Sequence, residues 1–242
     1  MTSVAIMQPT FIPWIGYFAM IGSVDKFVIL DDVQFSKQSW QSRNQIKTSS
    51  GPLILSLGVS RAKSKPLIKD ANLATTGFEK KLLKSIYDCL GRAPYYSIVA
   101  DLLEGAFDTA NGSLCDLNTG IIKKISSMSG FDTEFFFSSE LGIVSDAKGD
   151  RLVDICQHLE AHKYLSPVGS LDYLLCENPF AGSKVDLEFL NYRHPEYEQF
   201  YPPFISQMSV IDALAHLGPH RLQSFIMSGC ETPLTIDEVG VI

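Results

Sequence analysis

The sequence predicts an α/β fold: a Rossmann-like, mainly parallel sheet with helices on both faces and an added helical subdomain. Short apolar runs that suit buried strands alternate along much of the chain with segments of helical period. A strand, a helix and a second strand follow one another within about 30 residues, and such a βαβ unit places two parallel strands side by side. Residues 77–129, by contrast, show helical period with no strand between them.

The first βαβ unit begins the chain, with its strand, helix and strand expected over residues 4–7, 14–21 and 26–30. Pro13 suits the first turn of the helix, and Gly22-Ser23 ends it. Asp31-Asp32 closes the second strand. Both strand ends are therefore followed by polar residues at the same edge of the predicted sheet.

The rest of the chain supplies further strands and helices. A polar, aromatic loop over 33–50 leads to a strand at 53–59 and a basic arm at 60–76. Further strands are expected over 133–137, 163–166 and 185–190. Helices are expected over 78–90, 95–110, 114–128, 150–160, 210–217 and 221–227, with Asp150 capping the fourth. We expect one α/β domain over 1–242, with a helical insertion or cap at 77–129.

Composition narrows the classes of partner. The net charge of −7 gives no overall basic surface for a nucleic-acid backbone, so we expect no DNA binding. Five separate cysteines indicate a reducing compartment with free thiols and predict no metal site. No apolar run reaches about 18 residues, and no basic leader precedes the first strand. We therefore expect a cytoplasmic protein without membrane insertion.

Candidate ligand groups lie where the first two strands end, because open parallel sheets bind ligands at the carboxyl ends of their strands. Gln8 and Thr10 stand at the entry to a helix, where backbone N–H groups favour anions. Asp31 and Asp32 can hold a magnesium ion or a ribose, or take a proton. A turn with solvated carboxylates is the alternative for this acidic pair.

The loop from Gln34 to Lys47 is dense in amide, hydroxyl and basic side chains. Arg43 can bind a phosphate or a carboxylate through two parallel hydrogen bonds, and Trp40 can stack on a base or sugar ring. This mixture predicts a ligand-binding loop, with a polar edge hairpin as the alternative.

His194 follows a predicted strand and can act as an acid or a base near neutral pH, or be structural. His158 and His162 have a metal-like spacing, but the H-E-x-x-H pattern is absent, so we expect helix surface there. The chain has no G-x-S-x-G, P-loop or G-x-G-x-x-G motif. The sequence therefore gives little support for a classical serine hydrolase, a Walker ATPase or a dinucleotide-dependent oxidoreductase.

Three blocks of residues resemble one known family. The first comprises Met7-Gln8-Pro9-Thr10, Pro13 to Phe18, Leu30 to Lys37, Ser39-Trp40-Gln41, Arg43-Asn44 and Ile46-Lys47. The second comprises Arg151 to Cys156 with Tyr164-Leu165-Ser166, and the third His194-Pro195, Tyr197 and Ser209 to Leu214. Together they resemble the WbqC-like family over nearly the whole chain.

That resemblance implies a role in O-antigen and surface-polysaccharide biosynthesis, and hence in lipopolysaccharide formation. Members are proposed glycine transferases, which would place a glycyl group on the amine of a nucleotide-linked amino sugar. The expected partners are a dTDP- or UDP-linked amino sugar and glycine or a glycyl donor.

A more distant likeness concerns the HxGH signature of nucleotidyltransferases and class I tRNA synthetases. Here Trp14-Ile15-Gly16-Tyr17 occupies that position, so aromatic rings stand where both histidines would be. The architecture can be shared, but adenylyl transfer would lack its two imidazoles. If ATP activates glycine, residues other than Trp14 and Tyr17 must stabilise the transferred phosphate. Otherwise the glycyl donor arrives already activated, for example as an aminoacyl ester.

The leading hypothesis is therefore an aminoacyl transferase. Asp32 or His194 would be the base, and Arg43 and Lys47 would hold phosphate or the developing oxyanion. The substrate-binding residues would be Gln8, Thr10, Trp14, Tyr17, Asp31, Gln34, Lys37, Ser39, Trp40, Asn44 and Lys47. The alternatives are a nucleotidyltransferase-like enzyme and a non-catalytic nucleotide-sugar binding module. Phe135-Phe136-Phe137 suits either the core or an interface, so a homo-oligomer stays open.

Overall fold

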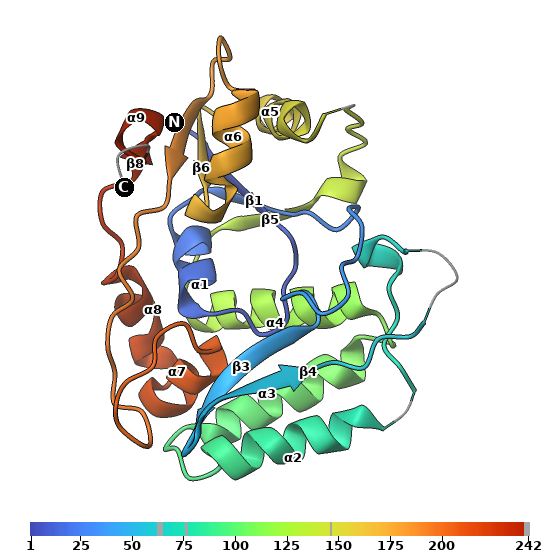
Figure 1. Cartoon of the computed structure of the whole chain (residues 1–242), viewed down its shortest axis with the longest axis vertical. Coiled ribbons are helices and arrows are strands. Elements are labelled where there is room, and N and C mark those ends of the chain that lie inside the picture. Colours follow the sequence, from blue (N-terminus) through green and yellow to red (C-terminus); the bar gives the residue numbers. More distant parts are fainter. Residues whose placement is uncertain (62–64, 76, 146, 240–242) are drawn as a thin grey trace.

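The computed structural model describes residues 1–61, 65–75, 77–145 and 147–239 (Figure 1). Its main sheet has six strands in the order β5-β2-β1-β6-β7-β8. The strands are β1 (Ser3–Met7), β2 (Lys26–Ile29), β5 (Glu134–Phe137), β6 (Lys163–Ser166), β7 (Asp186–Phe189) and β8 (Leu234–Thr235). All neighbours are parallel except β7 and β8. The predicted α/β fold with a mainly parallel sheet is confirmed.

Helices cover both faces of this sheet because successive strand residues point to opposite sides. Ala5 of β1 joins one hydrophobic cluster, and its neighbours Val4 and Ile6 join the other. The first cluster contains residues of α1 (Ile15–Gly22), α4 (Leu114–Met128), α7 (Val210–Leu217) and α8 (Pro219–Met227). The second contains residues of α5 (Lys148–His158), α6 (Leu171–Glu177) and α9 (Ile236–Val239).

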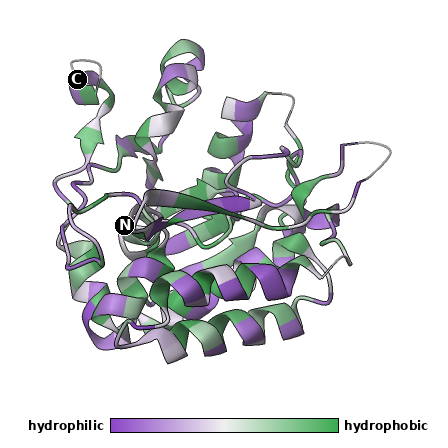
Figure 2. Ribbon diagram, turned by 60° about the horizontal axis from the view of Figure 1, so that its bottom comes forward, coloured by the Kyte–Doolittle hydropathy of each residue, from purple (hydrophilic) through white to green (hydrophobic). Residues whose placement is uncertain are grey.

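The helical run of the sequence forms α2 (Phe78–Leu90), α3 (Tyr96–Thr109) and α4 (Figure 1). Leu82, Ile86 and Leu90 repeat every four residues on the buried face of α2. In Figure 2, hydrophilic and hydrophobic residues likewise alternate along the helices, as expected for helices with one buried face. These side chains belong to the cluster that also contains Ile15 and Phe18 of α1. The single domain with a helical insertion stays a prediction, and this shared core is consistent with it.

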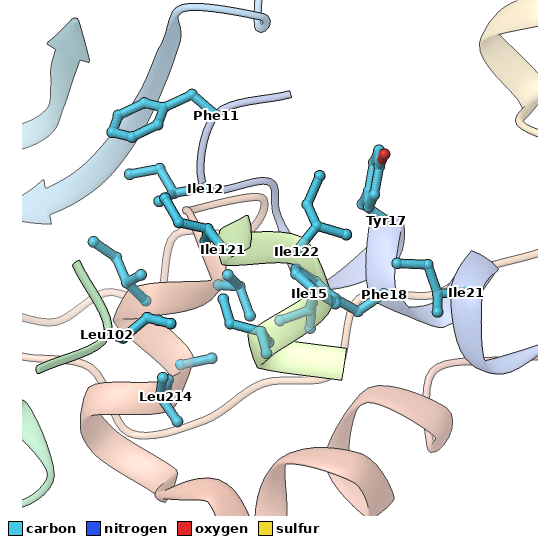
Figure 3. Packing of buried hydrophobic residues seen from close by; sticks show 14 of the residues in the cluster. Phe11, Ile12, Ile15, Tyr17, Phe18, Ile21, Leu102, Ile121, Ile122 and Leu214 are labelled. Carbon is cyan, nitrogen blue, oxygen red and sulfur yellow. The ribbon is translucent and has the colours of Figure 1, made fainter. Parts of the chain in front are cut away.

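The centre of that cluster packs the segment after β1 against α4 and α7. Phe11, Ile12 and Ile15 of α1 belong to one cluster with Ile121 of α4 and Leu214 of α7, and Ile12 lies next to Ile121 (Figure 3). Large aliphatic and aromatic side chains that are fully buried contribute several kcal/mol each to stability. The core therefore fixes the position of the segment that leads from β1 into α1.

A second sheet lies beside the helices and consists of one antiparallel hairpin, β3 (Arg43–Thr48) and β4 (Gly51–Ser56). The prediction of a loop through residue 50 is wrong for β3, and the alternative of a polar hairpin is correct there. Polar residues hid the strand: Asn44 and Lys47 are buried because they find polar partners inside the protein.

Smaller differences concern element ends and short elements. The helix expected at 150–160 begins at Lys148, so Asp150 lies in its first turn and does not cap it. The sequence pattern also missed α6, β8 and α9, which are too short for periodicity to reveal. No helix among the described residues is both long enough and apolar enough to cross a bilayer.

Candidate functional site

A crevice of about 430 Å³ lies at the point where the order of the parallel strands reverses, between β1 and β6. The helix after β1 packs on one face of the sheet, and the helix after β6 packs on the other. Such a divergence leaves an opening at the carboxyl ends of the strands, where open α/β sheets bind their ligands. The lining comes from Met7, from α1, from the segments after β6 and β7, and from Leu234 and Val239.

Three aromatic residues line this crevice: Trp14, Tyr17 and Tyr192. The rings of Trp14 and Tyr192 meet edge to face, with centroids 5.5 Å apart. The Trp14 indole lies over Gly16, where a Cβ would come within 2.2 Å of the ring. Tyr17 donates its hydroxyl hydrogen to the carbonyl of Gln8 at 3.1 Å. The crevice thus presents flat aromatic surfaces suited to a base or sugar ring.

His194 does not line the crevice: it lines a separate cavity of about 460 Å³, and its ring stacks on Trp14, which lines the crevice. Its imidazole is nearly parallel to Trp14, with an interplanar angle of 15° and a centroid distance of 5.9 Å. Nδ1 lies 2.8 Å from the carbonyl oxygen of Pro195, so it carries the proton and Nε2 keeps its lone pair. Burial lowers the pKa of His194, and the bond to Pro195 opposes that shift only in part. His194 is therefore neutral at pH 7 and able to accept a proton.

The acidic pair after β2 divides into a buried and a half-buried carboxylate. Asp31 is buried and accepts hydrogen bonds from the backbone N–H and the hydroxyl of Ser139, at 3.0 and 2.7 Å. Ser138 Oγ lies within hydrogen-bonding distance of both carboxylates, at 3.1 Å from Asp31 and 2.6 Å from Asp32. Asp31 therefore joins the end of β2 to the turn after β5.

Asp32 forms an ion pair with Arg151 of α5, with 2.5 Å between Nη2 and Oδ2. Partial burial opposes its ionisation, but the hydrogen bonds from Arg151 and Ser138 outweigh this and lower the pKa of Asp32. Asp32 is thus ionised at neutral pH and a weak proton acceptor. Its role as a base stays a prediction, and its charge suits it better to orienting a substrate cation.

Gln41 connects the end of β1 to the loop that follows β2. Its Nε2 donates to Gln8 Oε1 at 2.8 Å, and its Oε1 accepts the N–H of Ser36 at 2.8 Å. Asn118 of α4 donates to the carbonyls of both Gln41 and Pro9, at 2.8 and 3.1 Å. The position of Gln8 is therefore set from two sides. Thr10, also predicted to bind substrate, is half-buried in the same segment.

Asn44 and Lys47 have their polar groups engaged inside the protein. Asn44 Nδ2 donates to the carbonyls of Phe11 and Ile12, at 2.9 Å each. The Lys47 ammonium donates to the carbonyl of Pro203, and the Lys47 backbone N–H lies 3.4 Å from the Asp212 carboxylate. These contacts suit positioning roles; direct substrate contact by either residue stays a prediction.

The remaining predicted residues lie around another cavity, of about 620 Å³, which Gln34, Lys37 and Arg43 help to line. The Ser39 hydroxyl donates to the carbonyl of Ser36 at 2.7 Å. Trp40 is 57% exposed at the tip of this loop. The structure therefore divides the predicted residues between the strand ends, the crevice and this second cavity.

Comparison with known proteins agrees with the resemblance seen in the sequence. The model of the WbqC-like protein family matches residues 8–224. The chain belongs to the WbqC-like protein family. It is 29% identical over 221 residues to an uncharacterized protein of Mycobacterium tuberculosis, Rv1507c, covering 90% of this chain and 95% of that protein. No solved structure matches the chain.

This WbqC-like protein also has site residues that the sequence interpretation missed. Arg151 begins a helical block of the family, but nothing local indicates its pairing with Asp32, 119 positions away. Ser138 directly follows β5, so its place at a strand end was a usable signal. Tyr192 and Asn191 follow β7 in the same way and line the crevice. Side chains after β1, β6 and β7 thus line the crevice, whereas those after β2 and β5 form a separate polar cluster with Arg151.

Proposed function

We propose that this protein is an aminoacyl transferase that places a glycyl group on the amine of a nucleotide-linked amino sugar in O-antigen or surface-polysaccharide biosynthesis. One observation carries the proposal: the crevice between β1 and β6 has aromatic sides, and His194 stacks against one of them. Membership of the WbqC-like family supports the pathway. The nucleotide base or the sugar would stack on Trp14, with the amine near His194.

The reaction forms a C–N bond between the sugar amine and the glycyl carbonyl carbon, and it breaks the bond from that carbon to the activating group. An ammonium group loses two protons on the way to the amide. His194 Nε2 takes the first, which frees the amine to attack, and the second leaves the tetrahedral intermediate with the activating group, which departs with the bonding electrons. The Asp32 carboxylate, held by Arg151, would orient the amine in its cationic form before the first proton transfer. Arg43 faces the second cavity and would stabilise the negative charge of the donor.

The contacts favour a donor that arrives already activated over adenylation in this crevice. Tyr17 commits its hydroxyl hydrogen to the Gln8 carbonyl, and the Trp14 ring stacks against His194. Neither side chain is therefore placed to stabilise a pentavalent phosphate, as the histidines of an HxGH motif do. This reduces support for the nucleotidyltransferase-like alternative.

Two aromatic residues, Trp14 in the crevice and Tyr87 on the surface, offer a test of the binding part of this proposal. Trp14→Ala is expected to weaken the binding of a UDP- or dTDP-linked amino sugar by about 5- to 150-fold, because stacking on an aromatic ring is worth about 1–3 kcal/mol. Tyr87→Ala is the control, since Tyr87 is an aromatic residue 59% exposed on α2 and lines neither the crevice nor the second cavity. Isothermal titration calorimetry measures both affinities. Equal affinities in the two variants would place the nucleotide sugar elsewhere.

The pH dependence of transfer tests the state of His194. Burial lowers the pKa of this imidazole below its ordinary value of 6.5. Because only the neutral imidazole accepts a proton, kcat/KM is expected to rise with pH through a midpoint below 6.5 and to be level by about pH 7.5. Rates of incorporation of labelled glycine between about pH 4.5 and 8.5 give this profile. An acid limb centred above 6.5 would point to a different base.

A further inference from the structure

The second cavity is strongly basic although the protein is acidic. Its volume is about 620 Å³, and it lies between the loop after β2, the start of β3, the end of β4 and the segment after β4. Four basic residues line it, namely Lys37, Arg43, Arg61 and Lys65, and none of the lining residues that the structure describes is acidic. The chain as a whole carries a net charge of −7. A cluster of one sign against that background produces a local field that attracts anions.

None of these four side chains takes part in an ion pair within the parts of the chain that the structure describes. Like charges that share a cavity repel one another, and a bound anion removes that cost. Arg43 is half-buried at the first position of β3, opposite Ser56 of β4. Its planar guanidinium can therefore present two parallel N–H groups to a phosphate from a fixed strand position.

Neutral hydrogen-bonding groups complete the lining. They are the hydroxyls of Ser36, Ser42 and Ser56 and the amides of Gln34 and Gln38; the hydroxyl of Ser60, which also lines the cavity, donates its hydrogen to the carbonyl of Leu73. Phosphate oxygens accept several hydrogen bonds at once, so hydroxyl and amide donors beside cations suit them well.

The cavity is held in shape by backbone hydrogen bonds across it. Phe35 N–H donates to the carbonyl of Pro66, and Leu57 N–H donates to the carbonyl of Ser42, both at 2.8 Å. Gln41 links it to the sheet edge, because one side of its amide holds Ser36 and the other holds Gln8. The cavity is thus preformed and connected to the strand end beside the crevice, which lowers the cost of ordering a ligand.

We propose that this cavity binds a phosphate-bearing ligand of nucleotide size, the carrier of the acyl group, as a second substrate site. The volume lies in the range of small-molecule sites. The assignment of the ligand as the acyl carrier rests on the proposed function, because the transfer consumes a donor as well as the amino sugar. The binding of a phosphate-bearing anion rests only on the residues that line the cavity.

Calorimetric titration with inorganic pyrophosphate and with ATP tests this site. Both are expected to bind the wild-type protein, and Arg43→Gln is expected to weaken that binding at least tenfold, as the loss of a charge-assisted bidentate contact predicts. Lys37→Gln, on an exposed loop, should weaken it without risk to folding. Lys69→Gln is the matched control, because Lys69 is exposed near the same segment but does not line the cavity. Tighter binding of ATP than of pyrophosphate would show that the nucleoside is held as well.

The same variants are titrated with the UDP-linked amino sugar to separate the two sites. Arg43→Gln is expected to leave that affinity unchanged, and Trp14→Ala is expected to leave pyrophosphate affinity unchanged. Absence of pyrophosphate binding to the wild-type protein, or equal affinity in wild type and in both cavity variants, would overturn the proposal. An equal loss of both ligands in Arg43→Gln would make the cavity part of the amino-sugar site and overturn a separate one. Pyrophosphate binding without any amino-sugar binding would overturn the proposed function alone.

Discussion

Replacing His194 with glutamine is expected to lower kcat for glycyl transfer by about 10²- to 10⁴-fold, the usual contribution of a positioned general base. Glutamine keeps polar atoms at the site but accepts no proton near pH 7. KM for the amino sugar should change little, because Trp14 and Tyr192 supply the stacking surfaces. Steady-state rates with labelled glycine, together with the melting midpoint, separate loss of chemistry from loss of fold.

The control for this variant is His220→Gln. His220 is exposed on α8 and lines neither the crevice, nor the basic cavity, nor the cavity that contains His194. It should keep the wild-type rate. A wild-type rate in His194→Gln would remove His194 from the mechanism and leave Asp32 as the candidate base, despite the ion pair that lowers its pKa.

The second large effect is expected on stability. Asn44→Ala should lower the free energy of unfolding by about 1–3 kcal/mol, because it leaves the buried carbonyl of Phe11 without its hydrogen bond, while Ser209 Oγ still donates to the carbonyl of Ile12 at 2.6 Å. Urea denaturation at constant m value measures the change. Because this segment leads from Gln8 into α1, transfer activity should fall as well.

Asn72→Ala is the matched control for Asn44→Ala. Asn72 is exposed, and its side-chain amide contacts only the nearby carbonyl of Asp70. The Asn72→Ala substitution should lower the free energy of unfolding by no more than about 0.5 kcal/mol. If the two variants have equal stability, the carbonyl of Phe11 does not depend on Asn44, and the assignment of Asn44 as a positioning residue is wrong.

The parts of the fold that could be predicted from the sequence are those that depend on local apolar pattern. The run from Val4 to Met7 and the helix that follows are buried on nearly every side, so their pattern is clear. The sequence pattern did not reveal the hairpin, because Asn44 and Lys47 are polar residues at buried positions of β3. Their partners, at Phe11 and Pro203, are distant in the sequence, and no local pattern indicates such partners.

The sequence predicted which strand ends lie at one edge of the sheet, but not how the candidate residues are arranged there. The rule that ligands bind at the carboxyl ends of parallel strands placed Gln8 and Asp32 at the correct edge. Residues on one loop, however, were expected to share one site. The loop instead directs Lys37 and Arg43 into the basic cavity, while Gln41 bonds to Gln8. Which side of a loop faces a strand end depends on tertiary contacts, which one sequence does not contain.

A crystal structure of the protein with a UDP- or dTDP-linked amino sugar tests the central claim most directly. We predict the ligand in the crevice between β1 and β6, with its base or sugar stacked on Trp14 and its amine within hydrogen-bonding reach of His194 Nε2. A ligand bound in the basic cavity against Arg43, with the crevice empty and His194 remote from the amine, would contradict it.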